Sequence, residues 1–85
     1  MDKKLPYGNI LTPQGLGLAV RAYRRAQGMT QADLAGLCGV GTRFISDLEN
    51  GKPTIALGKA LQVMQCLGME LALKPRGWPG AGNSL

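Results

Sequence analysis

Histidine is absent from this 85-residue chain, and only five residues are acidic: Asp2, Asp33, Asp47, Glu49 and Glu70. A histidine base, a histidine-containing zinc site and a cluster of carboxylates are common means of acid-base or metal chemistry. The chain offers none of them. The sequence therefore argues against an enzyme, and it implies no cofactor and no metal.

Cysteines are few and long hydrophobic runs are missing. Cys38 and Cys66 are the two cysteines, and both have apolar neighbours within predicted helices. A thiol in such a place behaves as a small hydrophobic group, so we expect reduced cysteines rather than a disulfide. No apolar run approaches the roughly 20 residues of a membrane span, and residues 1–9 have no apolar signal core. These absences favour a cytoplasmic protein without a membrane partner.

What the chain does have is positive charge. Ten Lys and Arg residues against five acids give a net charge of +5 and an isoelectric point near 9.7. Such a balance suits a polyanionic partner such as nucleic acid, although a basic, well-hydrated surface is the simpler interpretation. Eighty-five residues allow one domain with a small core, and chains of this size often gain stability by forming oligomers.

The first predicted helix has clear signals at both ends. Thr12 is a good capping residue, Pro13 suits the first helical position, and Gly28 is a typical stop signal. Residues 1–11, rich in charge and turn formers, are expected to be a flexible leader. The buried stripe of the helix is predicted to comprise Leu16, Ala19, Val20 and Tyr23.

Residues 31–50 are predicted to form two short helices joined by a tight turn. Thr30 can cap the first helix, with Asp33 completing a capping box, and Gly39 lies where the chain must turn. Leu34 and Leu37 are expected to face inward, and the small Ala35 and Gly36 to let the two helices cross closely. The second helix should begin at Gly41 or Thr42 and bury Ile45 and Leu48.

The remaining chain is predicted to contain one more helix and one strand. Thr54 can cap a helix that runs to about residue 67 and stops at Gly68. Residues 69–75 then alternate, which places Met69, Leu71 and Leu73 on one face of a strand. A lone strand leaves backbone groups unpaired, so we expect it to pair with its own copy in a homodimer; a short strand in residues 8–11 is the competing partner.

Residues 76–85 are rich in glycine and proline and are predicted to be a flexible tail. The tail carries the only tryptophan, Trp78. Exposure of a large apolar ring to solvent is unfavourable, so we expect Trp78 either to fold back on the domain or to contact a partner.

Three segments resemble the phage-repressor-like XRE family of helix-turn-helix regulators: TQADLA from Thr30, the turn at Gly39 and Val40, and ISDLENGK from Ile45. The resemblance implies a mainly α, phage-repressor-like helix-turn-helix domain. Together with the elements predicted above, residues 12–75 are expected to form about four helices and one C-terminal strand that pairs across a homodimer. The helix that begins near Thr42 would be the recognition helix. The resemblance also implies an ion pair between Arg24 in the first helix and Glu49 at the end of the recognition helix.

A recognition helix places its outward residues against base edges in the major groove. Here these are Thr42, Arg43 and Asp47, with Phe44 possible. Arg43 is the best candidate, since its guanidinium can bond both O6 and N7 of guanine. Phe44 either touches a thymine methyl group or packs on the domain, and Asp47 either accepts from cytosine or repels wrong sites.

Phosphate contacts are expected on both sides of that helix. Gln31 begins the first motif helix, where a side chain and a helix N-terminus both face the DNA backbone. Asn50 and Lys52 match the residues that the family uses on the other side. A homodimer would bind double-stranded DNA as an inverted repeat, with half-sites about one helical turn apart or a multiple of it.

The span 16–75 is similar to the HipB-type antitoxins, through RFISDLENGKPT, the helix ending CLG, and the strand MELALKP. That resemblance implies an autorepressor that also restrains a HipA-like serine/threonine kinase toxin, with Trp78 as a candidate toxin contact. Two alternatives remain open. One is a repressor without a toxin, and the other is a protein-binding adaptor that no longer binds DNA.

Overall fold

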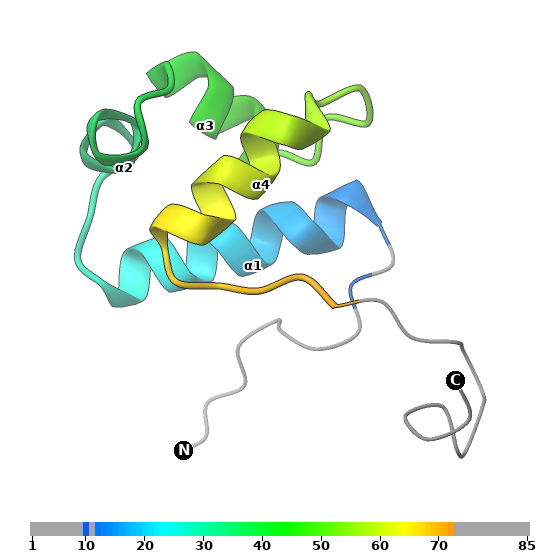
Figure 1. Ribbon diagram of the computed structural model, residues 1–85, viewed down its shortest axis with the longest axis horizontal. Helices are drawn as coiled ribbons and strands as arrows, with labels where there is room; N and C mark the ends of the chain where they lie inside the picture. The colour runs from blue at the N-terminus through cyan, green and yellow to red at the C-terminus, as the bar shows by residue number, and fades with distance from the viewer. Residues whose placement is uncertain (1–9, 11, 73–85) are drawn as a thin grey trace.

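Four helices make up the described part of the chain, which comprises residue 10 and residues 12–72 of a computed structural model. They are α1 (Pro13–Ala26), α2 (Gln31–Cys38), α3 (Thr42–Glu49) and α4 (Leu57–Cys66) (Figure 1). Helices α2 and α3 pack against each other, α1 packs on α3, and α4 packs on α2. The mainly α, four-helix prediction is confirmed. Within these residues no helix combines the length and apolar character needed to span a bilayer.

Local capping fixes where the first two helices begin. The Thr12 hydroxyl accepts a hydrogen bond from the Gly15 amide at 2.9 Å, directly before Pro13. Thr30 and Asp33 form the predicted capping box, in which each side chain accepts from the other's backbone N–H at 3.0 Å. The backbone hydrogen bond from Thr30 lowers the pKa of Asp33 below its ordinary value. Both predicted helix starts are confirmed.

The turn between α2 and α3 depends on a glycine. Gly39 ends α2 with φ 72° and ψ 32°, in the left-handed region where a side chain is disfavoured. Val40 follows and is half-buried against the core. Gly41 then caps α3 without a side chain, and the helix proper starts at Thr42. The chain thus turns from one helix into the next within three residues, Gly39 to Gly41, as the motif requires.

The core lies between all four helices. Its largest fully buried side chains are Val20 of α1, Leu34 of α2, Ile45 and Leu48 of α3, and Val63 of α4. Burial of each such aliphatic side chain contributes about 1.5–3 kcal/mol. Leu16 and Tyr23 of the predicted α1 stripe are half-buried at the edge of this core.

Two predictions about α2 are wrong. Leu37 is 61% exposed, because the inward face of α2 is formed by Leu34, Ala35 and Cys38. Gly36 makes no close helix crossing, since a Cβ placed there would have no atom within 4 Å. Spacings of three and four residues both describe a helical face, and in so short a helix only packing decides between them.

A close helix approach lies instead between α1 and α3, at Gly17. Gly17 faces the carboxyl end of α3, where a Cβ would collide with the carbonyl oxygen of Leu48 and lie 2.6 Å from that of Glu49. Real Cβ atoms essentially never come so near, so only glycine fits. The sequence analysis did not single out Gly17. This contact allows the α1 backbone to support the end of α3 directly.

The start of α4 also differs from the prediction. The helix begins at Leu57 with Ala56 as its cap, and no side chain caps it. Thr54 lies instead in the turn that follows Pro53. The backbone N–H of Ile55 donates to the Lys52 carbonyl, and the helix starts two residues later than a Thr54 cap would place it.

Residues 69–72 follow α4 after Gly68, whose φ is 75°. They contain no strand; Met69 is half-buried and Leu71 is 52% exposed. Leu73, Trp78 and most of the predicted leader and tail lie outside the described residues. The intermolecular strand therefore stays a prediction.

The two cysteines are free thiols with different surroundings, and this predicts different reactivity. Cys38 is buried, whereas Cys66 is exposed. Burial, with a hydrogen bond to the Cys66 thiol as the second cause, raises the pKa of Cys38 to about 12. At neutral pH we expect a maleimide to label Cys66 at once and Cys38 only in denaturant, as counted by intact-mass spectrometry. Rapid double labelling of the native protein would contradict the burial of Cys38.

A pH dependence follows from the same raised pKa. The folded protein holds the Cys38 proton more tightly than the unfolded chain does, so the contribution to stability is full below about pH 9 and falls as the pH rises towards 12. Urea unfolding at pH 7 and pH 10 measures this loss. In Cys38→Ala, the part of the alkaline loss that is due to Cys38 should disappear.

Candidate nucleic-acid interface

Helix α3 separates its polar and apolar residues onto two faces. Ile45, Leu48 and Glu49 are buried against the domain. Thr42 and Arg43 are exposed, and Ser46 and Asp47 are half-buried. The spacing of these four residues gives one outward strip along the helix. The predicted base-contacting residues Thr42, Arg43 and Asp47 therefore share one surface.

The side chain of Arg43 is available for an external partner. It is exposed near the N-terminal end of α3, and in the described part of the chain no hydrogen bond or ion pair holds its guanidinium. A guanidinium offers five N–H donors in a planar fork, which suits bidentate contacts. This is the arrangement that reading a guanine edge requires.

Phe44 packs partly on its own domain. Its ring is half-buried against the core, and the Lys59 ammonium of α4 lies 5.9 Å from the ring centroid. A cation at that distance over an aromatic face is weakly attracted to it. Lys59 was not foreseen, because it meets α3 only through the tertiary fold. Its position brings a second positive charge close to the outward strip.

Two polar pairs cover the carboxyl end of the strip. The Lys52 ammonium lies 3.6 Å from the Asp47 carboxylate, and both side chains are partly exposed. The Asn50 amide donates to the Ser46 hydroxyl at 3.4 Å. Exposed pairs of this kind contribute little stability, about 0–1 kcal/mol, so either can open when another partner arrives. The predicted phosphate contacts Asn50 and Lys52 thus adjoin the predicted base contact Asp47.

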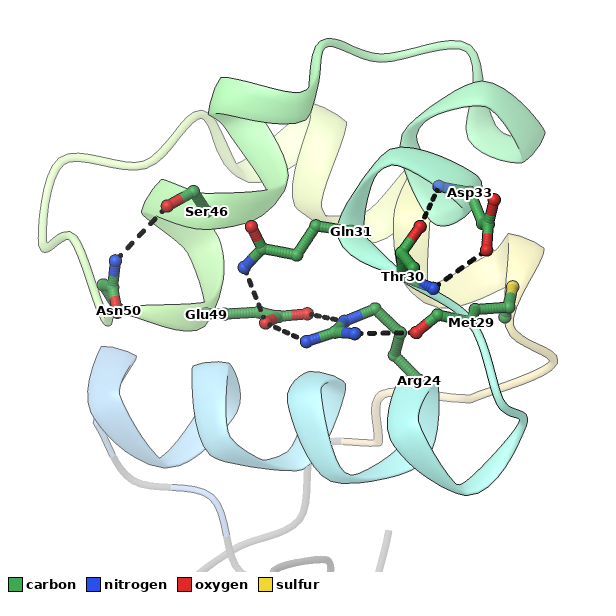
Figure 2. Close-up of polar contacts among 8 residues, drawn as sticks. All are labelled: Arg24, Met29, Thr30, Gln31, Asp33, Ser46, Glu49 and Asn50. Atoms are coloured by element: carbon green, nitrogen blue, oxygen red, sulfur yellow. Dashed lines mark hydrogen bonds and ion pairs between the residues drawn. The ribbon is translucent and has the colours of Figure 1, made fainter.

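A buried ion pair holds α3 to α1. Arg24 donates through Nε to Glu49 Oε2 at 2.6 Å and through Nη2 to Oε1 at 3.0 Å, a bidentate contact (Figure 2). Its Nη1 donates to the carbonyl oxygen of Met29 at 2.7 Å, in the loop before α2. The hydrogen bond to Glu49 raises the pKa of Arg24, against the opposing effect of burial. The network therefore joins α1, the loop and the end of α3.

Gln31 is tied into the same network. Its amide nitrogen donates to Glu49 Oε1 at 3.0 Å from the first turn of α2 (Figure 2). Gln31, the predicted phosphate contact, is therefore half-buried, and its side chain is held by Glu49 rather than free in solvent. Among the described residues, no buried side-chain nitrogen or oxygen lacks a hydrogen-bond partner.

The model of the family described as "Helix-turn-helix" matches residues 20–74, which is well over half of the chain. The chain belongs to the helix-turn-helix family, of the XRE type.

Among its relatives is the uncharacterized HTH-type transcriptional regulator y4mF of Sinorhizobium fredii. The two sequences are 50% identical over 68 residues, which cover 80% of this chain and 90% of the relative. The protein is accordingly a transcriptional regulator of the helix-turn-helix class.

Solved structures of HipB are similar in fold. The HipB chain of a "HipB-O4 20mer complex" matches with a TM-score of 0.75 and 27% identity, over 82% of this chain and 99% of that chain. A chain of the HipA-HipB-O2-O3 complex matches with the same values. The similarity covers nearly the whole of those chains, so the match is not limited to the two motif helices.

In this helix-turn-helix protein the loop after α3 is also fixed by a glycine. Gly51 has φ 77°, and a Cβ there would lie 2.8 Å from the Cα of Gln14 in the first turn of α1. The loop that carries Asn50 and Lys52 therefore rests on the start of α1. Sequence alone does not reveal this requirement, because the contact of Gly51 with Gln14 depends on how the helices pack.

Proposed function

We propose that this protein is a cytoplasmic, sequence-specific DNA-binding autorepressor that acts as a homodimer on an inverted-repeat operator. The outward strip of α3 carries the proposal, with the unpaired guanidinium of Arg43 at its N-terminal end. The net charge of +5 favours association with the polyanionic duplex. Thr42, Arg43, Phe44 and Asp47 are the proposed base contacts, and Gln31, Asn50 and Lys52 the proposed phosphate contacts.

We further propose an antitoxin role, in which the protein binds and restrains a HipA-like serine/threonine kinase toxin. The similarity to HipB chains over 82% of this chain, including a HipB in complex with HipA, supports this step. A repressor without a toxin is the second candidate, since the 50% identical relative is described only as a transcriptional regulator. Trp78 stays the proposed toxin contact, and Met69, Leu71 and Leu73 the proposed dimer strand.

A gel shift on the DNA upstream of the protein's own gene tests the autorepressor. We expect retardation at nanomolar to submicromolar protein in about 0.15 M salt, against much weaker retardation of an unrelated duplex. Failure to shift any duplex at low salt would leave the adaptor interpretation. Co-purification with the product of the neighbouring gene tests the antitoxin role, and a neighbour without kinase sequence features would contradict it.

The Arg43→Ala variant separates base reading from charge. It should lose about 1–3 kcal/mol on the operator and lose its preference at one base pair of each half-site. Arg43→Lys keeps the charge but not the planar fork, so it should resemble the alanine variant in specificity. Binding to a set of single-base operator variants, measured by fluorescence anisotropy, gives these values.

Lys52→Gln is the matched contrast. It should weaken operator and non-specific DNA alike, and it should reduce the slope of log K against log salt by about 1. If Arg43→Ala showed this uniform pattern as well, Arg43 would be a phosphate contact and not a base contact.

A further inference from the structure

The amide of Gln31 has one hydrogen-bond donor engaged and one to spare. Nε2 carries two hydrogens, and one of them bonds Glu49 Oε1 at 3.0 Å. That oxygen also accepts from Arg24 Nη2, while Oε2 accepts from Arg24 Nε. Figure 2 shows Glu49 between Arg24 on one side and Gln31 on the other. Among the described residues the second N–H of Gln31 has no acceptor, so it can donate to an external one.

The acceptor of Gln31 is buried, and both of its carboxylate oxygens accept hydrogen bonds from Arg24. The Glu49 side chain is 2% exposed and that of Arg24 is 9% exposed. Arg24 is fixed further by its bond to the Met29 carbonyl at 2.7 Å. Glutamine has three side-chain torsions, and a surface glutamine would normally lose that freedom only when it binds. Here the freedom is already restricted in the folded protein, before any DNA arrives.

The charge of Glu49 would repel a phosphate if it were uncompensated. The bidentate contact with Arg24 neutralises the carboxylate, so its oxygen can orient an amide beneath a DNA backbone without a net negative charge beside it. A buried ion pair of this type contributes little net stability. Because Glu49 also accepts from Gln31, the ion pair can hold the Gln31 amide in one orientation.

We propose that Glu49 is a positioning residue for DNA binding: the Arg24–Glu49 pair holds the Gln31 amide so that its second N–H faces a phosphate oxygen of the duplex. This inference rests on the proposed function, because it requires both DNA binding and the Gln31 phosphate contact. It goes beyond the structural role of the ion pair, since it makes the affinity contributed by Gln31 depend on an oxygen at position 49.

Two double variants isolate that oxygen. Arg24→Met/Glu49→Gln and Arg24→Met/Glu49→Met both remove the two charges and keep similar side-chain lengths. Only the first retains an oxygen that can accept from Gln31. Each is combined with Gln31→Met, which keeps the length of the side chain and removes its donors. Circular dichroism at the binding temperature establishes that all variants are folded before the operator Kd is measured.

Gln31→Met should weaken operator binding by about 5- to 10-fold in the wild-type and Arg24→Met/Glu49→Gln backgrounds, but by less than about 2-fold in Arg24→Met/Glu49→Met. Because Gln31 is neutral, Gln31→Met should leave the salt dependence of binding unchanged in every background. Equal weakening in all three backgrounds would overturn the positioning role and leave the phosphate contact and DNA binding intact.

Two other outcomes are distinguishable. If Gln31→Met binds as tightly as the wild type, the phosphate contact is absent and the inference falls with it, while DNA binding stands. If the wild type binds no DNA, the proposed function itself fails.

A measurement on the wild-type protein covers the case in which a double variant does not fold. In NMR spectra, the two side-chain amide protons of Gln31 give separate signals. On addition of operator DNA, the proton bonded to Glu49 should keep its shift while the other moves downfield. Displacement of the Glu49-bonded proton would show that DNA releases Gln31 from the pair, and would overturn the proposal.

Discussion

The variant Gly17→Ala is expected to destabilise the protein by about 3 kcal/mol or more. The new Cβ would collide with the Leu48 carbonyl oxygen and lie 2.6 Å from that of Glu49 and 2.8 Å from its carbonyl carbon. These are backbone atoms at the end of α3, which cannot move aside as a flexible side chain could. Helix α1 and the end of α3 would have to separate, which disturbs the support of α3.

The sign of this effect makes the test decisive. Helix propensity alone favours alanine over glycine by about 1 kcal/mol in a helix interior. Gly36→Ala is the matched control, since Gly36 lies in α2 with nothing within 4 Å of an added Cβ, and it should leave the protein unchanged or up to about 1 kcal/mol more stable. Urea unfolding followed by circular dichroism measures both. An unchanged midpoint for Gly17→Ala would refute the close contact of α1 with α3.

The second large effect is expected from Glu49→Ala, at about 3–5 kcal/mol of lost stability. The substitution leaves the buried guanidinium of Arg24 without its carboxylate and removes the acceptor of Gln31. An uncompensated buried charge costs more than the ion pair contributes. A small domain has a total stability of typically about 5–15 kcal/mol, so this loss would be a large fraction of it.

Removing both charges should restore most of the loss. Arg24→Met/Glu49→Met replaces the pair by apolar side chains of similar length, and such replacements are often neutral or stabilising. Thermal and urea unfolding of the single and double variants form a double-mutant cycle. If the losses of unfolding free energy were additive, the double variant would be less stable than either single variant. That result would contradict the explanation that the cost arises from leaving one charge of the pair uncompensated.

The ends of the first helices were predictable because capping is local. Thr12 with Pro13, and Thr30 with Asp33, satisfy backbone N–H groups within three residues, so no distant part of the chain is needed to place them. Gly39 was equally clear, since a left-handed residue is required between α2 and α3. These short-range signals gave the motif and therefore the family.

Other features depended on which faces of the helices meet. Leu37 was predicted inside and lies outside, because spacing from Leu34 fits a helical face equally well through Leu37 or Cys38. Thr54 was predicted to cap a helix, but the turn that follows Pro53 delays α4 to Leu57. A pattern of polar and apolar residues cannot rank two equivalent faces or detect such a turn.

The candidate site also has features that the sequence predicts and features that only the structure shows. Sequence reasoning found the outward strip of α3, since Thr42, Arg43 and Asp47 alternate with the buried Ile45 and Leu48 at helical spacing. It did not find that Lys59 approaches Phe44 or that Lys52 pairs with Asp47. The first contact joins α3 to α4, and the second depends on how the loop after α3 folds back on that helix.

By itself, the sequence determined the helix-turn-helix motif, its caps and turn, and the residues on the outward face of its second helix, because all of these follow from interactions within about four residues of chain. Only the tertiary structure decided that Gly17 must be glycine and that Gln31 is held by Glu49. Both are contacts between residues 18 or more apart, and their geometry exists only once α1, α2 and α3 have packed together.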